Sequence, residues 1–149
     1  MKPSEIIGGA INLIEDPSNW TTGQLFDYDK NANKTCMCGL GALSAAAHKI
    51  TSNEGNIRLH DDFDDLENDA YCASAAEHRA AVRALAEAIM PEGYVMEPGE
   101  DMYDIVYTFN DGSNPYQPSG EPDLAAAASH ERIIAKLKEV KTQLEKENR

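Results

Sequence analysis

Cys38 is the residue of this chain whose type and position could most directly supply a nucleophile. It precedes Gly39 at the start of an expected helix, where backbone N–H groups lower the pKa of a thiol. Gly39 could also offer an N–H to an oxyanion hole. A nucleophilic cysteine needs a base, usually a histidine, and His48 lies roughly 15 Å along the same helix. Only tertiary packing could bring His78 to Cys38, and the alternative is a buried structural thiol.

The same cysteines could instead bind a metal. Cys36, Cys38, Cys72 and His78 would together supply four soft ligands for zinc. The single residue between Cys36 and Cys38 is shorter than the spacing that structural zinc sites prefer. A metal-stabilised structural domain therefore stays an alternative, but the spacing favours no metal ligands and no cofactor.

A run of oxygen-bearing side chains resembles the start of a calcium loop, with ligands at alternate positions: Asp27, Asp29, Asn31 and Asn33. Such a loop needs glycine at its sixth position and a bidentate glutamate at its twelfth. Ala32 and Cys38 occupy those two positions. We therefore interpret the run as a polar hairpin turn.

The charge of the chain excludes some classes of partner. Its formal net charge is −13, from 26 acidic and 13 basic side chains. Such a surface repels the phosphates of nucleic acid and the head groups of anionic membranes. We expect no direct nucleic-acid binding and no membrane binding. The three cysteines and the acidic N-terminal segment favour a reducing, cytoplasmic location.

The elements that must position these residues follow from apolar periodicity. The spacing predicts a mainly α, single-domain bundle of about five helices over residues 1–149. The helices are expected at about residues 3–15, 38–48, 74–91 and 101–109, with a last helix that begins at 123 or 129. Ser74 and Glu77 form the sequence pattern of a capping box at the third of these helices.

The segments between the helices are expected to be a hairpin and two loops. Aromatic and turn residues predict a short β-hairpin near residues 20–35. Residues 51–70 are polar and carry six acids in positions 61–69, so we expect an exposed acidic loop. Residues 112–122 are rich in proline, glycine and serine and predict a second loop.

Two tyrosines at helical spacing are candidate contact residues. Tyr103 and Tyr107 are i, i+4 neighbours in an aromatic segment. They would serve either as core packing or as a patch for a protein partner, because tyrosine is enriched at interface centres. Trp20 and Gln24 are the other candidate binding residues.

Several short motifs together resemble a known pattern. They are Trp20 with Gly23-Gln24, Cys38-x-x-Gly41-Ala42-Leu43, Phe109-Asn110-Asp111, and a last helix of the Ile133-Ile134-x-x-Leu137 type. The chain is similar to a family of small uncharacterised proteins of actinobacteria and their bacteriophages. The family has Gln-Gly where this chain has Gly-Gln, and Trp where it has Phe109.

The resemblance implies an accessory protein of a phage or prophage and no particular reaction. It also singles out Cys38, Asn110 and Asp111, which would form a catalytic site only if they shared one cleft. With no complete catalytic constellation in the sequence, a non-enzymatic protein that binds a host or phage protein is the first hypothesis. A Cys-dependent hydrolase or transferase with Cys38 as nucleophile is the alternative.

Overall fold

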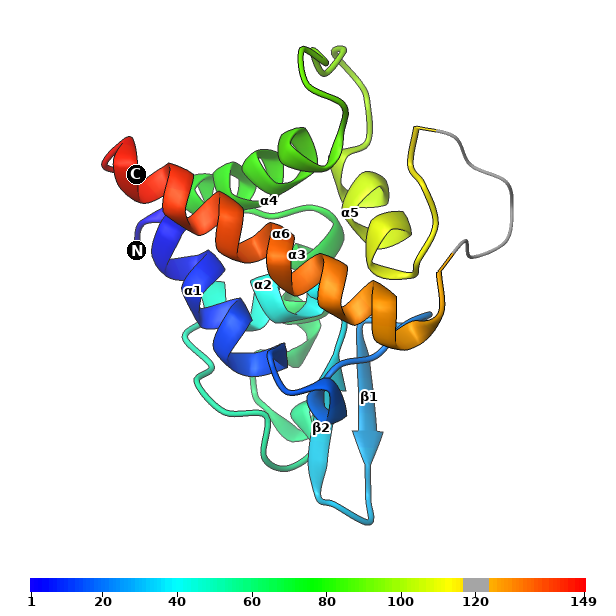
Figure 1. Ribbon diagram of the computed structural model, residues 1–149. Coiled ribbons are helices and arrows are strands. Elements are labelled where there is room, and N and C mark those ends of the chain that lie inside the picture. Colours follow the sequence, from blue (N-terminus) through cyan, green and yellow to red (C-terminus); the bar gives the residue numbers. More distant parts are fainter. Residues whose placement is uncertain (117–123) are drawn as a thin grey trace.

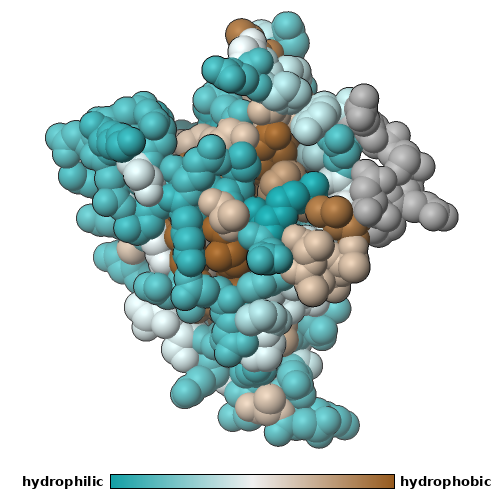
Figure 2. Space-filling view, viewed as in Figure 1, coloured by the Kyte–Doolittle hydropathy of each residue, from teal (hydrophilic) through white to brown (hydrophobic). Residues whose placement is uncertain are grey.

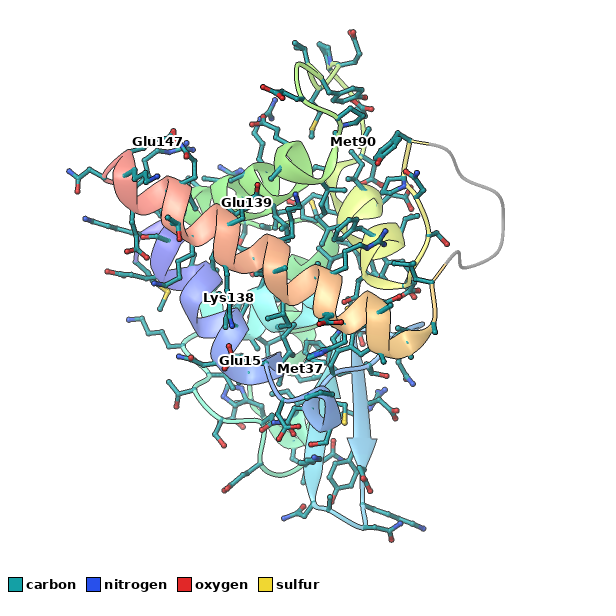
Figure 3. The ribbon with its side chains drawn as sticks, viewed as in Figure 1. Glu15, Met37, Met90, Lys138, Glu139 and Glu147 are labelled. Atoms are coloured by element: carbon teal, nitrogen blue, oxygen red, sulfur yellow. The ribbon has the colours of Figure 1, made fainter. Side chains whose placement is uncertain are left out.

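The first and last helices of the fold pack antiparallel against each other (Figure 1). The computed structural model describes residues 1–116 and 124–149, and in it α1 (Pro3–Ile14) and α6 (Ala126–Lys146) join the two ends of the chain. The N–H of Ser4 donates to the carbonyl of Arg149 at 3.3 Å. At the C-terminal end of α1, Glu15 forms a 2.9 Å salt bridge with Lys138 of α6 (Figure 3). Hydrophilic side chains cover most of this face, and apolar ones gather in small patches near its centre (Figure 2).

The central element is α2 (Gly39–Ala47), which contacts α1, α3, α4 and α5. All its residues from Gly39 to Ala46 are buried. Its small residues allow this close packing, most clearly at Gly41. A Cβ there would lie 2.4 Å from the carbonyl oxygen of Leu25 and 3.1 Å from its carbon. Helix α2 is therefore held against the chain just before the hairpin.

The predicted hairpin is present as β1 (Phe26–Asp29) and β2 (Lys34–Met37), which pair antiparallel. The other edge of β2 is covered by loop segments. The N–H of Thr35 donates to the carbonyl of Asn53 at 2.8 Å, and the N–H of Thr21 donates to the carbonyl of Met37 at 3.1 Å. Strand β1 therefore forms the outer edge of the sheet (Figure 1).

The segment expected as an acidic loop contains a helix, α3 (Phe63–Tyr71), preceded by the short 3₁₀ helix η2 (Ile57–Leu59). The loop prediction for residues 51–70 was wrong in this part. Leu66 and Ala70 are buried one turn apart, and Phe63 packs at the edge of the core. This narrow apolar stripe suffices because Asp64, Asp65 and Glu67 are exposed, Asp69 pairs with His48, and acids in the first turn favour the helix dipole.

The remaining two helices pack against each other and frame the upper part of Figure 1: α4 (Ala76–Ile89) and α5 (Met102–Asn110). Asp101 caps α5 by accepting hydrogen bonds from two backbone N–H groups. The capping box predicted at α4 does not form. Ala75 is the N-cap, and Ser74 instead donates to the carboxylate of Asp69 through both its N–H and its hydroxyl.

The described residues thus form six α-helices and one two-stranded hairpin, a mainly α fold as predicted. The predicted loop at 112–122 lies partly outside these residues, and its first residues, 112–116, form neither helix nor strand. Within the described part of the chain, no helix combines the length and the apolar character needed to span a bilayer.

Candidate functional site

The side chain of Asn110 connects three segments that are distant in sequence. It is fully buried at the end of α5. Its Oδ1 accepts hydrogen bonds from the indole N–H of Trp20 at 2.8 Å and from the N–H of Gly39 at 2.9 Å. Its Nδ2 donates to the carbonyl of Thr21 and to the Asp111 carboxylate, both at 3.1 Å. All its polar capacity is used in holding the fold together.

Asp111 and Trp20 extend this junction. The Asp111 carboxylate accepts the N–H of Gly23 at 3.2 Å, and Gly23 has the positive φ of +78° that this turn requires. The ring of Trp20 packs edge-on against His130, with centroids 5.2 Å apart. Trp20, predicted to bind a partner, is thus committed to contacts inside the protein.

Cys38 lies beside this junction but has no access to solvent. It is the N-cap of α2, and its Sγ accepts the N–H of Gly41 at 3.5 Å. Burial raises its pKa to about 12, and the backbone hydrogen bonds that favour the thiolate do not offset this. The sequence left two interpretations of Cys38 open, a thiol with a pKa lowered by the helix N-terminus and a buried structural thiol, and the structure has the buried thiol. Desolvation, which the sequence does not show, is the larger effect.

The histidines are held elsewhere. His48 Nε2 lies 2.8 Å from Asp69 Oδ2, and His130 Nε2 lies 2.8 Å from the carbonyl oxygen of Ile14. His78 is buried in α4. Among the described residues, no histidine forms a hydrogen bond with Cys38. Cys38, Asn110 and Asp111 therefore meet at a buried structural junction, and the open cleft required of a catalytic site is not found there.

The residues of the two metal sites considered from the sequence, the cysteine zinc site and the calcium-like loop, have structural roles. Cys36 donates to the carbonyl of Ser18 at 3.3 Å, and Cys72 is exposed at the end of α3. Asp29 accepts the N–H groups of Asn31 and Ala32, as in a polar turn. In the described ranges, no three His, Cys, Asp or Glu side chains are placed to hold one metal ion.

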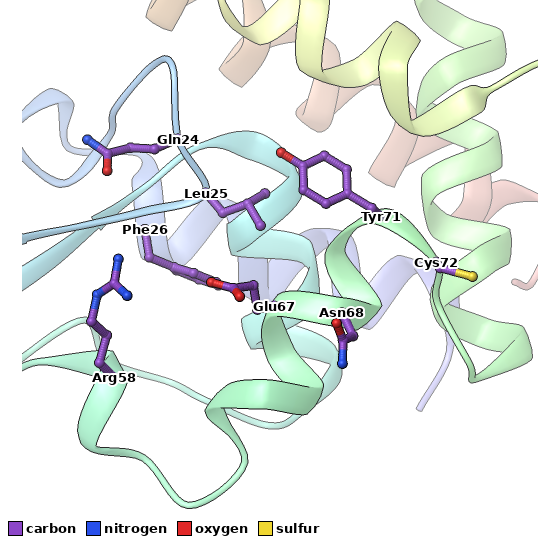
Figure 4. Close-up of a pocket in the computed structure, with 8 residues that line it drawn as sticks. All are labelled: Gln24, Leu25, Phe26, Arg58, Glu67, Asn68, Tyr71 and Cys72. Atoms are coloured by element: carbon purple, nitrogen blue, oxygen red, sulfur yellow. The ribbon is translucent and has the colours of Figure 1, made fainter.

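A hollow in the surface is lined by residues at the start of β1, in η2 and in α3. It has a volume of about 800 Å³ (Figure 4). We call it the β1–α3 groove and define it by its lining residues: Gln24, Leu25, Phe26, Arg58, Glu67, Asn68, Tyr71 and Cys72. Its apolar side chains come mainly from the start of β1 and from Tyr71. Arg58 and Glu67 both extend toward Phe26 (Figure 4), so the groove offers one charge of each sign beside an aromatic ring.

Packing keeps the walls of this groove in place. The guanidinium of Arg58 lies 5.4 Å from the centre of the Phe63 ring, a cation–π contact. Phe26 packs on the same ring with centroids 5.9 Å apart. Tyr71 is 48% exposed, and its ring packs at a tilt against Tyr107 with centroids 6.2 Å apart. The pKa of Tyr107 is raised to about 12, by burial first and by the Asp111 carboxylate second, so its hydroxyl stays protonated.

A second hollow, of about 480 Å³, is also lined by Tyr71. Met96, Met102 and Tyr103 supply its apolar surface, and Glu97, Glu100 and Asp101 supply acidic groups. Tyr103 accepts the N–H of Ala73 at 2.9 Å through its hydroxyl. Tyr71 therefore belongs to both hollows, and we refer to the pair as the Tyr71 surface.

Sequence reasoning found only part of this surface. Gln24 and Tyr103 were predicted and line it, and Tyr107 supports it from below. Arg58, Glu67 and Tyr71 were missed. The signal that could have found them is the i, i+4 spacing of Glu67 and Tyr71 on the polar side of a helix, which the acidic composition concealed.

Fold and surface define a small, mainly α protein with a buried polar junction and an open groove beside an edge strand. The chain belongs to DUF6197, a family of unknown function, whose family model matches residues 1–117. Comparisons with curated proteins and with solved structures find no match.

Proposed function

We propose that this chain is a non-enzymatic accessory protein that binds a basic segment of another protein through the Tyr71 surface. The observation that carries the proposal is the β1–α3 groove of about 800 Å³, which ends at the half-exposed ring of Tyr71. Tyrosine and arginine are the residues most often responsible for affinity at protein interfaces, and both lie here on firmly packed supports.

The second hollow enlarges the area that a partner could cover. Met96 and Met102 offer flexible, polarisable side chains that adapt to a partner's shape. The two hollows meet at Tyr71, so one protein segment could contact both. Such an extended surface suits a polypeptide better than a small molecule, which usually takes an enclosed pocket.

Charge supports a basic partner. The chain carries a net charge of −13. Glu67 lines the groove, and further exposed acids lie in α3 and its N-terminal flank: Asp61, Asp62, Asp64 and Asp65. A negative electrostatic potential on this surface speeds the association of positively charged proteins and favours them over negatively charged ones. A basic host or phage protein would meet this condition.

The proposed setting rests on the sequence resemblance. Similarity to proteins of actinobacteria and their phages favours an accessory protein of a phage or prophage. All three cysteines are free, which supports the cytoplasm as the proposed location.

Co-purification with matched tyrosine variants tests the proposal. Tyr71 and Tyr116 are 48% and 49% exposed, but Tyr116 lies outside both hollows. A protein captured from actinobacterial lysates should be retained by the wild-type chain and by Tyr116→Ala, and lost by Tyr71→Ala. The captured protein is then identified, purified and titrated at rising salt, which should weaken binding. Equal binding by Tyr71→Ala, or no captured protein at moderate salt across several hosts, would overturn the proposal.

A further inference from the structure

The outer edge of β1 has backbone groups directed away from the sheet. The N–H of Cys38 donates to the carbonyl of Leu25 at 3.1 Å, so these residues form a hydrogen-bonded pair at the end of the ladder. Hydrogen-bonded and non-hydrogen-bonded pairs alternate along an antiparallel ladder. With the observed register, Asp27 and Asp29 bond to β2, while Phe26 and Tyr28 direct their N–H and C=O groups outward.

Hydrogen bonds at the edge of β2 that faces away from β1 confirm which residues direct their backbone groups outward. Thr35 and Met37 are the partners of Tyr28 and Phe26 in the register. Both use backbone groups for bonds away from β1, to Asn53 and Thr21 respectively. Among the described residues, none forms a hydrogen bond with the outward backbone groups of Phe26 or Tyr28.

This free edge begins at the β1–α3 groove. Leu25 and Phe26 belong both to the chain entering β1 and to the lining of the groove. A strand added to β1 would therefore have one face next to the groove, with Arg58, Glu67 and Tyr71 within the same hollow (Figure 4).

We propose that the β1 edge binds an extended segment of the partner protein as an additional strand, in which apolar and basic residues alternate. The proposal rests on the proposed function and specifies its mode of binding. Side chains alternate between the two faces of a strand. Those beside Phe26 and Tyr28 would be apolar and enter the groove. Those on the other face would meet the exposed carboxylates of Asp27 and Asp29, which favour lysine or arginine.

The same carboxylates disfavour a second copy of this chain as the added strand. Pairing two β1 edges would bring Asp27 and Asp29 of one copy close to those of the other, and like charges on neighbouring strands repel. Charged residues on a short edge strand commonly prevent self-association in this way. A basic segment removes the repulsion, so charge selects a different protein as the occupant.

A synthetic peptide of about twelve residues that alternates lysine with valine or leucine is the probe. Its control has the same composition in an order with helical periodicity. NMR on the full chain should show binding of the alternating peptide, with slowed hydrogen exchange at the N–H of Tyr28, which is less buried in the free chain than Phe26. Binding of either peptide without this protection would overturn strand addition and leave the proposed function standing. If neither peptide binds while the co-purified protein does, the strand proposal fails alone, and if that protein is also absent, both fail.

Two variants of one residue separate backbone pairing from side-chain contact. Tyr28→Pro removes an outward N–H that β2 does not use, whereas Tyr28→Thr keeps the N–H and loses the ring. The Tyr28→Pro variant should bind the alternating peptide about tenfold more weakly than the Tyr28→Thr variant. A tenfold loss of affinity corresponds to the net contribution of about one backbone hydrogen bond. Circular dichroism confirms that both variants are folded. Equal affinities of the two folded variants would contradict the proposal.

Discussion

The buried Oδ1 of Asn110 accepts a hydrogen bond from the indole N–H of Trp20 at 2.8 Å, across 90 residues of the chain. The same oxygen accepts the N–H of Gly39, so one side chain ties the segment before the hairpin, the start of α2 and the end of α5. The Trp and Asn-Asp motifs of the sequence are thereby explained as parts of one structural junction.

Asn110→Ala should destabilise the fold by about 3 kcal/mol, because it leaves the Trp20 and Gly39 donors without an acceptor in the interior. Asn110→Asp should cost more, since it places a carboxylate against the Thr21 carbonyl and the Asp111 carboxylate. Urea unfolding measures both changes. Asn12→Ala on the exposed side of α1 is the control, expected within about 0.5 kcal/mol of wild type. A similarly small effect at Asn110 would contradict the role of the junction.

Gly41→Ala should also be strongly destabilising, for a steric reason. The added Cβ would lie 2.4 Å from the Leu25 carbonyl oxygen, so either α2 or the entry to β1 must move. We expect a loss of about 3 kcal/mol or more in the free energy of unfolding. Gly39→Ala in the same helix is the matched control, because its Cβ would come no closer than 3.4 Å to any neighbouring atom. Equal losses for the two variants would show that the close approach is not the cause.

The three thiols should react in the order of their exposure. With iodoacetamide at about pH 7, exposed Cys72 should be labelled first, and Cys36 more slowly. Cys38 should stay unlabelled in the folded chain, because its thiol is buried and its pKa is raised to about 12. Peptide mass spectrometry gives the order, and labelling in urea is the control that makes all three reactive. Fast labelling of folded Cys38 would instead restore the nucleophile hypothesis.

Local sequence patterns were sufficient to predict most of the fold. The apolar stripes of α1 and α6, and the turn residues that end the helices, depend on neighbours along the chain, and these predictions were confirmed. Helix α3 was missed because only Phe63, Leu66 and Ala70 face the core, among six acids in positions 61–69. Its composition is that of a solvated segment, although its spacing is helical.

The candidate site depends on contacts that no local pattern contains. The groove combines the start of β1 with Arg58 and with Tyr71, which are brought together only by tertiary packing. The pKa of Cys38 likewise depends on how many atoms cover its thiol. The sequence shows the helix N-terminus, which lowers the pKa of a thiol, but it could not decide whether the thiol is buried, and burial is the effect that raises the pKa of Cys38.

Stability should fall at mildly acidic pH because of His78. Its side chain is 1% exposed, its Nε2 has no hydrogen-bond partner within the described structure, and burial lowers its pKa to about 4. Asp69 and His48 face it and act in opposite directions, the carboxylate raising its pKa and the imidazole lowering it. Because the folded-state pKa lies below the unfolded value near 6.5, protonation favours the unfolded chain.

The contribution of His78 to the free energy of unfolding is therefore complete above about pH 6.5 and is lost as the pH falls toward 4. Burial by itself raises the pKa of Asp69, but hydrogen bonds with His48 and Ser74 bring the pKa below its ordinary value of 3.8. The contribution of Asp69 to stability is therefore lost only as the pH falls below about that value and stays constant in this window. Urea unfolding at about pH 7.5 and about pH 5.5 should differ by about 1 kcal/mol in wild type. His78→Phe should abolish most of that difference, whereas His60→Gln, at an exposed position, should retain it. An unchanged pH dependence in His78→Phe would show that other groups cause the loss.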